Sequence, residues 1–238
     1  MIKNSSENSV CVVIPAYNEA TAIGDVVRDI IKALGVSNYI FEVVVVDDGS
    51  KDETASIAKR NGAKVIRHIL NSGSGSATAT GLSYADQRGF SMAATMDADG
   101  QHAPKDILKG FSLLEKHQID LLIGSRLINS KGMSKVKVIG NKGLSFITFL
   151  IFGINSTDSQ SGMRIFSSRA LKQLRWRTSG YEFCSEMLWR AKQIGLSIDE
   201  YPIKAIYTEY SRTKGQNNWN AFNIIKVLIR RRLTELFQ

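Results

Sequence analysis

Residues 10–50 read VCVVIPAYNEATAIGDVVRDIIKALGVSNYIFEVVVVDDGS, and this stretch decides the fold. The apolar runs at residues 10–14 and 41–46 have the length and the β-branched composition of buried strands. Between them, apolar residues recur at helical spacing from residue 23 to residue 34, in a helix expected to start near residue 18. A strand, a helix and a second strand in this order predict two parallel strands connected by a crossover helix.

The same alternation continues along the first half of the chain. Further strands are predicted at residues 63–66, 91–96 and 121–124, with helices at 52–60, from the Gly/Ser-rich loop 71–76 to residue 88, and at 104–117. This order predicts a single Rossmann-like α/β domain with a mostly parallel central sheet flanked by helices. In such sheets ligands bind beyond the carboxyl ends of the strands, and polar motifs follow three of the predicted strands.

The composition and net charge of the chain indicate which classes of partner it binds. The chain has 238 residues, of which 43% are hydrophobic and 22% charged, a balance typical of a globular protein and not of a disordered one. Its formal net charge of +9 favours anionic partners, namely nucleic acid, an anionic membrane surface or phosphorylated substrates. Cys11 and Cys184 lack metal-ligand spacing and are interpreted as buried free thiols. The polar N-terminus lacks the apolar core of a signal peptide, so we expect a cytoplasmic catalytic domain.

An acidic pair follows the strand predicted at residues 91–96. Asp97 and Asp99 are one residue apart, so their carboxylates can converge on a hard divalent cation. Mg²⁺ binds through one or two carboxylates together with substrate phosphates, and Mn²⁺ suits the same ligands. Such a metal stabilises the charge that builds up on a departing nucleoside diphosphate. Taken alone, the pair fits a helix cap or a solvated turn equally well, and His102 beside it fits either a metal-facing or a supporting position.

A second acidic turn follows the strand at residues 41–46. Asp47 and Asp48 precede Gly49 and Ser50, and a helix is predicted to begin directly afterwards. These carboxylates could accept hydrogen bonds from the base or ribose of a nucleoside. They could equally cap the following helix through its first backbone N–H groups.

The order of these motifs resembles family 2 of the glycosyltransferases, which has the GT-A fold. The motifs are residues 15–19 (PAYNE), 47–52 (DDGSKD), 97–102 (DADGQH), 124–126 (GSR), 157–164 (TDSQSGMR) and 180–183 (GYEF) with Glu186. The last three are similar to the dolichyl-phosphate mannosyltransferase branch, whose members make polyprenyl-phosphate sugars. The resemblance extends over roughly residues 10–215. Gly100 departs from the Asp-Leu-Gln common in the mannosyltransferases, so the sugar is left open between mannose, glucose and N-acetylglucosamine.

The resemblance implies a role for each matching residue. Pro15, Tyr17 and Glu19 would border the nucleoside, and Asp47 or Asp48 would contact it. Asp97 and Asp99 would hold Mg²⁺ or Mn²⁺ against the diphosphate, with Gln101 close to the metal. Arg126, Arg164 and Arg212 would bind the lipid phosphate, because the planar guanidinium pairs bidentately with phosphate oxygens. Asp99, Arg126, Arg164 and Glu186 are the expected catalytic set.

The acceptor determines whether a general base is needed. A lipid phosphate is already ionised near neutral pH, since its second pKa is about 6, and it needs no base. A sugar hydroxyl must lose a proton during the reaction, and Glu186 and Asp158 are then the candidate bases.

The expected function is therefore inverting transfer of a hexose from a GDP- or UDP-sugar to a polyprenyl or dolichyl phosphate. Transfer to a sugar hydroxyl of a glycolipid or polysaccharide is the alternative. A non-catalytic nucleotide-sugar or nucleic-acid binding module is a remote one, and the chain has no RNP, KH or zinc signature that would support a nucleic-acid partner.

Two apolar segments in the second half bear on membrane contact. The run at residues 144–154 is shorter than the roughly 20 residues that span a bilayer, so it predicts a buried helix or an interfacial one. The tail after residue 218 combines apolar residues with Arg230, Arg231 and Arg232, which predicts a basic amphipathic helix that lies on an anionic membrane or packs on the domain. The predicted organisation is a flexible N-terminus (1–9), a GT-A catalytic domain (10–215) and a basic amphipathic C-terminal helix (216–238). The enzyme is expected to be peripheral at the cytoplasmic face of the membrane.

Overall fold

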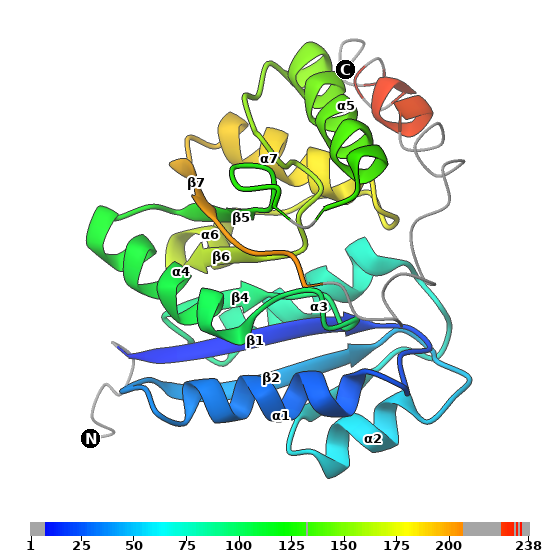
Figure 1. Cartoon of the computed structure of the whole chain (residues 1–238), viewed down its shortest axis with the longest axis vertical. Helices are drawn as coiled ribbons and strands as arrows, with labels where there is room; N and C mark the ends of the chain where they lie inside the picture. The colour runs from blue at the N-terminus through cyan, green and yellow to red at the C-terminus, as the bar shows by residue number, and fades with distance from the viewer. Residues whose placement is uncertain (1–7, 132, 207–224, 231, 233, 235–238) are drawn as a thin grey trace.

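The computed structural model describes residues 8–131, 133–206, 225–230, 232 and 234, and its centre is one mixed sheet (Figure 1). The strand order is β3-β2-β1-β4-β6-β5-β7. The strands are β1 (Ser9–Ala16), β2 (Ile40–Asp47), β3 (Lys64–Arg67), β4 (Met92–Thr95), β5 (Leu121–Ser125), β6 (Arg164–Ser167) and β7 (Ile198–Pro202). All neighbouring strands are parallel except β6, which runs antiparallel to both β4 and β5. The predicted mostly parallel α/β sheet is confirmed.

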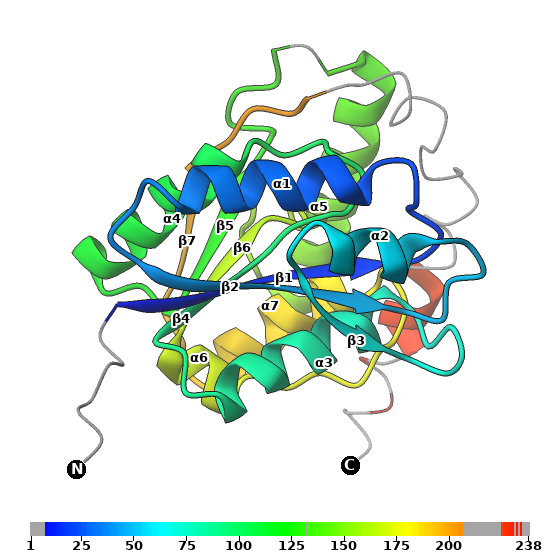
Figure 2. The same cartoon turned by 90° about the horizontal axis from the view of Figure 1, so that it is seen from below.

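Helices cover both faces of the sheet (Figure 2). They are α1 (Ile23–Leu34), α2 (Thr54–Arg60), α3 (Ser74–Gln87), α4 (Pro104–His117), α5 (Lys135–Phe152), α6 (Ser168–Gln173) and α7 (Phe183–Gln193). Side chains alternate along β1, so Val12 enters the core beneath α1 and α4, whereas Val13 enters the core beneath α3 and α7. Two apolar cores therefore form, one on each face of the sheet.

The reversed strand β6 brings a late segment of the chain to the acidic motif. Thr95, at the end of β4, pairs with Arg164, the first residue of β6. Because β6 runs opposite to its neighbours, its first residue lies at the edge of the sheet where the parallel strands end, here called the carboxyl edge. Residues 157–164 are thereby placed beside Asp97 and Asp99.

One local expectation is corrected by the structure, and two features go beyond what was predicted. Helix α1 begins at Ile23 and not near residue 18, because residues 18–20 form a loop that hydrogen-bonds to residues 50–54. Residues 144–152 of the apolar run form the second half of the longer helix α5, of which only one side is buried. β6, α6, α7 and β7 were not predicted from the sequence.

The described part of the C-terminal tail lies against the domain. Residues 225–230 are helical, and Leu228 is buried in the same core as Trp189 of α7. The guanidinium of Arg232 lies 5.7 Å from the ring centroid of Trp189. The predicted boundary at residue 216 and the remainder of the tail fall outside the described residues.

Close packing of α3 on the sheet depends on a glycine. A Cβ added at Gly81 would lie 2.1 Å from Cγ1 of Val13. At Gly140, in α5, an added Cβ would meet no atom within 4 Å. The two positions therefore form a matched pair of helical glycines that differ in the space available.

We predict that Gly81→Ala lowers the free energy of unfolding by about 1–3 kcal/mol, because the extra methyl group overfills a packed core. Gly140→Ala should instead raise it by roughly 0.5–1 kcal/mol, through helix propensity. Urea denaturation followed by circular dichroism measures both. Equal effects of the two substitutions would contradict the packing of α3 described here.

Candidate active site

Asp97 is held at the carboxyl edge by a buried histidine. Nε2 of His102 lies 3.0 Å from Oδ2 of Asp97, and the His102 side chain is fully buried whereas that of Asp97 is 44% exposed. A carboxylate only accepts hydrogen bonds, so Nε2 carries the proton in this contact. His102 in turn forms a backbone bridge to Ala205. The imidazole is thus fixed by the fold and orients the carboxylate of Asp97.

Gly162 forms the wall behind Asp97. A Cβ added at Gly162 would lie 2.1 Å from Oδ1 and 2.3 Å from Oδ2 of Asp97. Oγ1 of Thr95 donates to the carbonyl of Gly162 at 2.8 Å, which holds this backbone against the end of β4. Only a glycine leaves room for the carboxylate at this position.

The two carboxylates of the acidic motif have pKa values displaced in opposite directions. Burial raises the pKa of Asp97, but the hydrogen bond and charge of His102 and the charges of Arg126 and Arg164 outweigh it and hold the pKa below its usual value. Burial, followed by the negative charge of Asp97, raises the pKa of Asp99 to about 6, and Glu19 adds to the effect. A nearby cation would therefore stabilise the ionised form of Asp99 more than that of Asp97.

This donor set fits Mg²⁺ or Mn²⁺ bound together with a diphosphate. Among the described residues, no group of three or more His, Cys, Asp or Glu side chains is placed to hold an ion alone. Mg²⁺ accepts one or two carboxylates and completes its shell with water and substrate phosphates, which Asp97 and Asp99 permit. The backbone N–H of Gln101 donates to Oδ1 of Asp99 at 3.0 Å, so Gln101 at least orients the pair.

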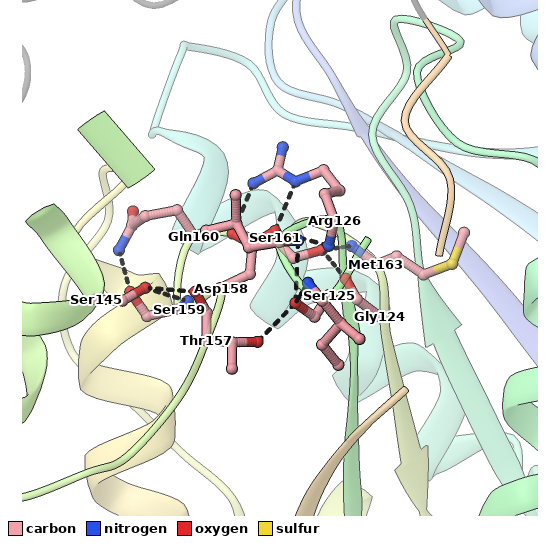
Figure 3. Close-up of polar contacts among 12 residues, drawn as sticks. Gly124, Ser125, Arg126, Ser145, Thr157, Asp158, Ser159, Gln160, Ser161 and Met163 are labelled. Carbon is pink, nitrogen blue, oxygen red and sulfur yellow. Dashed lines mark hydrogen bonds and ion pairs between the residues drawn. The ribbon is translucent and has the colours of Figure 1, made fainter. Parts of the chain in front are cut away.

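A bidentate ion pair joins the end of β5 to the loop before β6 (Figure 3). Nε of Arg126 lies 2.7 Å from Oδ2 of Asp158, and Nη2 lies 2.9 Å from Oδ1. The backbone N–H of Arg126 also donates to Asp158, at 3.1 Å. The Asp158 side chain is fully buried, and that of Arg126 is 12% exposed. Three donors from one residue therefore occupy the Asp158 carboxylate.

Hydroxyl groups fasten the same two loops together beside this ion pair. The hydroxyls of Ser125 and Thr157 lie 2.7 Å apart (Figure 3). Glu200 of β7 accepts hydrogen bonds from Ser156 Oγ at 2.7 Å and from the backbone of Thr157 at 2.9 Å. No pattern in the sequence pointed to Glu200, because its role depends on strand β7, which was not predicted.

Arg164 is buried below the acidic motif. Its Nη2 donates to the carbonyls of Ser159 at 2.8 Å and Cys184 at 3.2 Å, and its guanidinium lies 5.7 Å from the ring centroid of Phe183. Its Nε has no hydrogen-bond acceptor within the described part of the chain. Arg164 therefore supplies positive charge close to Asp97 from inside the protein.

Glu186 lies in the first turn of α7 and is fully buried. Its carboxylate accepts hydrogen bonds from the backbone of Thr178 at 2.8 Å and of Arg177 at 3.2 Å, and lies 3.6 Å from Nε of Arg190. These contacts hold the loop that precedes α7, and a catalytic role for Glu186 stays a prediction.

The second acidic turn organises two neighbouring loops. Asp47, fully buried, accepts from the backbone of Ser50 at 3.0 Å, and Oγ of Ser50 accepts from the backbone of Asn18 at 2.9 Å. Oγ1 of Thr54 accepts from the backbone of Glu19 at 2.8 Å. The loop after β1, which contains the exposed Tyr17 and follows Pro15 at the end of that strand, is thereby joined to the loop after β2.

Asp48 fastens a third loop at the same edge. It accepts hydrogen bonds from the backbone N–H groups of Ser72 at 2.9 Å and Gly73 at 2.7 Å. Nδ1 of His68 lies 2.7 Å from it, and Nε2 of His68 lies 3.0 Å from the Thr80 hydroxyl. Contact between a nucleoside and Asp47 or Asp48 stays a prediction, because the described contacts of both carboxylates are internal.

The structure thus gathers most of the predicted site at one edge of the sheet. Asp97, Asp99, Arg126, Arg164 and Glu19 are close enough for their charges to act on the acidic pair. Their contacts with ligands stay predictions. Arg212 lies outside the described residues.

Comparisons with known proteins identify the family of this chain. Residues 11–175 match the model of glycosyl transferase family 2, and the chain belongs to that family. A UDP-N-acetylglucosamine–dolichyl-phosphate N-acetylglucosaminyltransferase of Methanococcus voltae is 42% identical, over 94% of this chain and 96% of that protein. An undecaprenyl-phosphate mannosyltransferase of Micrococcus luteus is 30% identical, over 86% of each.

A solved structure confirms the expected GT-A fold. Glucosyl-3-phosphoglycerate synthase from Mycobacterium tuberculosis, in complex with Mn²⁺, uridine diphosphate and glucosyl-3-phosphoglycerate, superposes with a TM-score of 0.70. The match is 20% identical and covers 94% of this chain and 78% of that one. The chain is therefore a family 2 glycosyltransferase with the GT-A fold.

We predict that Asp99→Asn raises the melting temperature of the metal-free protein by a few degrees near neutral pH. The folded protein raises the Asp99 pKa from 3.8 to about 6, so the folded state binds a proton more tightly than the unfolded state does. This contribution to stability is full below the unfolded pKa and is lost as the pH rises through about 6.

The asparagine variant avoids that loss, so its advantage should vanish near pH 4. Thermal melts between about pH 4 and pH 7.5 in chelator measure the difference, with Asp29→Asn, on the exposed side of α1, as the control. A variant less stable than the wild type at every pH would rule out the raised pKa.

Proposed function

We propose that this enzyme transfers a hexose, with inversion, from a UDP- or GDP-sugar to the phosphate of a polyprenol or dolichol. The observation that carries the proposal is that both candidate bases, Asp158 and Glu186, are already engaged in internal contacts. Asp158 is occupied by Arg126, and Glu186 is occupied by backbone N–H groups beneath the surface. An acceptor that is already ionised needs neither of them.

The reaction is a single in-line displacement at the anomeric carbon. An oxygen of the lipid phosphate attacks from the face opposite the nucleoside diphosphate and forms a new bond to that carbon. The bond from the carbon to the diphosphate oxygen breaks, its electrons leave with the diphosphate, and the configuration inverts. A bound Mg²⁺ or Mn²⁺ would supply charge stabilisation to the diphosphate.

The residues of this chain would provide positive charge and positioning. Asp97 and Asp99, oriented by His102 and by the backbone of Gln101, would hold the metal with the diphosphate. Arg126 directly follows β5, which lies on the other side of β4 from β1 and β2, and would meet the acceptor phosphate there. Arg164 would contribute its charge from beneath, since preorganised charge in a partly buried site costs no rearrangement during the reaction.

The similarity to the Methanococcus voltae enzyme supports UDP-N-acetylglucosamine as the first donor to test and dolichyl phosphate as the first acceptor. The similarity to the Micrococcus luteus mannosyltransferase makes a mannose donor the second one to test. Within the described ranges, no helix is both long enough and apolar enough to cross a bilayer. A peripheral position at the cytoplasmic face, where nucleotide-sugars are made, completes the proposal.

The test is product formation from a panel of UDP- and GDP-sugars with a short-chain polyprenyl phosphate and Mn²⁺ or Mg²⁺. We expect metal-dependent formation of a sugar–lipid phosphate that is lost in chelator and reduced by at least about a hundredfold in Asp99→Ala. Asp29→Ala, which changes an exposed aspartate far from the carboxyl edge, should retain full activity. Donor hydrolysis or binding without any lipid product would contradict the proposed acceptor.

Glu186→Gln separates this reaction from transfer to a sugar hydroxyl. Glutamine still accepts the hydrogen bond of the Thr178 backbone, so turnover should fall by less than about tenfold when Glu186 only positions its loop. Loss of a general base would reduce turnover by roughly 10²–10⁴. A loss of that size, with donor binding and melting temperature unchanged, would move the proposal to a hydroxyl acceptor.

A further inference from the structure

Helix α5 presents a row of large apolar side chains to solvent. The exposed fractions are 71% for Val136, 71% for Ile139, 60% for Phe146, 47% for Phe149 and 63% for Leu150. Single exposed apolar side chains are common on protein surfaces, whereas five on one helix form a patch that indicates an interaction site.

These side chains share one side of the helix. Positions 136, 139, 146 and 150 recur at intervals of three, seven and four residues, which places them in one stripe. Leu144, Thr148 and Phe152 lie on the opposite side and are buried in the domain. Gly140 and Gly143 lie along the outer stripe, and a Cβ added at either would meet no atom within 4 Å. The stripe is thus uncovered by the described residues.

The charge of α5 favours an anionic surface as the partner of this stripe. The helix contains Lys135, Lys137 and Lys142 and has no aspartate or glutamate in its sequence. Lys135 and Lys142 are exposed and border the apolar stripe on one side. The helix is not long and apolar enough to cross a membrane. An apolar stripe bordered by lysines is the arrangement of a helix that lies in the plane of an anionic bilayer.

Helix α5 is also connected to the candidate active site. Oγ of Ser145 accepts a hydrogen bond from the backbone N–H of Ser159 at 3.0 Å (Figure 3). Oγ1 of Thr148 lies 2.8 Å from Oγ of Ser185. Ser159 directly follows Asp158, which binds Arg126. The buried side of α5 therefore packs on the loop that positions the predicted phosphate-binding arginine.

We propose that the outer stripe of α5 docks the enzyme on an anionic lipid bilayer. The apolar side chains enter the boundary of the acyl chains, and Lys135 and Lys142 contact lipid phosphates. The reason for docking rests on the proposed function, because docking through α5 would bring the active site to the membrane in which a polyprenyl phosphate resides. Binding to the bilayer itself needs no substrate and can be measured separately.

The experiment is co-sedimentation of the full chain with vesicles of phosphatidylcholine containing roughly one-third phosphatidylglycerol. We expect Phe146→Ser/Leu150→Ser to weaken binding by at least about tenfold, because two apolar anchors are lost. Lys135→Glu/Lys142→Glu should abolish the preference for anionic over pure phosphatidylcholine vesicles. The melting temperature should not fall in either variant, since all four side chains are exposed.

Matched substitutions at exposed residues elsewhere provide the controls. Val36→Ser/Ile40→Ser removes two side chains that are 85% and 61% exposed, one in the loop after α1 and one at the start of β2. Lys59→Glu/Lys64→Glu reverses two exposed lysines on α2 and β3. Both should bind vesicles as the wild type does. Equal binding by the α5 variants and the controls would overturn the proposal. So would a wild-type dimer that becomes monomeric in Phe146→Ser/Leu150→Ser, which would make the stripe a contact between two copies.

A substrate comparison distinguishes failure of this inference from failure of the proposed function. The α5 variants should keep turnover of a short, water-soluble polyprenyl phosphate and lose turnover of a long-chain one presented in vesicles. Absence of turnover in every form of the enzyme, with vesicle binding that still depends on α5, would refute the proposed reaction alone.

Discussion

The repulsion between the carboxylates of Asp97 and Asp99 is the constraint on which the rest of the site depends. The fold forces these groups together at the end of β4, with Gly162 behind one of them and His102 holding it. Burial and this repulsion together raise the pKa of Asp99. Such an arrangement is unfavourable for the protein alone, and a bound divalent cation would neutralise it, as in a binding site that is preorganised at some expense in stability.

The remaining charged groups near this pair are held in place by internal contacts. Arg126 is held by Asp158, and Arg164 is buried beneath the sheet edge with its charge directed at Asp97. Breaking a buried ion pair leaves an uncompensated charge, so the Arg126–Asp158 pair resists rearrangement. A positively charged surround in which both Asp158 and Glu186 are engaged in internal contacts would suit an acceptor that arrives already ionised. Helix α5, which packs on this loop, offers the surface from which such a lipid acceptor could be taken.

The first half of the fold could be predicted from the sequence because its signals are local. Apolar runs, helical spacing and polar turns identified β1 to β5 and α1 to α4 with small errors at their ends. The second half could not, because β6 (RIFS) and β7 (IDEYP) lack a continuous apolar run and acquire their places from pairing with distant strands. The sequence likewise pointed to Arg126 and Asp158 separately, but their pairing depends on the reversed strand β6. The apolar run at residues 144–154 left open whether the helix is buried or interfacial, because the run does not show which of its side chains face the domain.

The most direct test of the account is calorimetric binding of uridine and guanosine diphosphates in the presence and absence of Mn²⁺. The account predicts that Mn²⁺ strengthens binding of one diphosphate by at least about tenfold. It also predicts that Asp97→Asn/Asp99→Asn removes this gain while leaving metal-free binding unchanged. Equal affinity with and without Mn²⁺ in the wild-type protein would contradict the central claim that this acidic pair is a metal–diphosphate site.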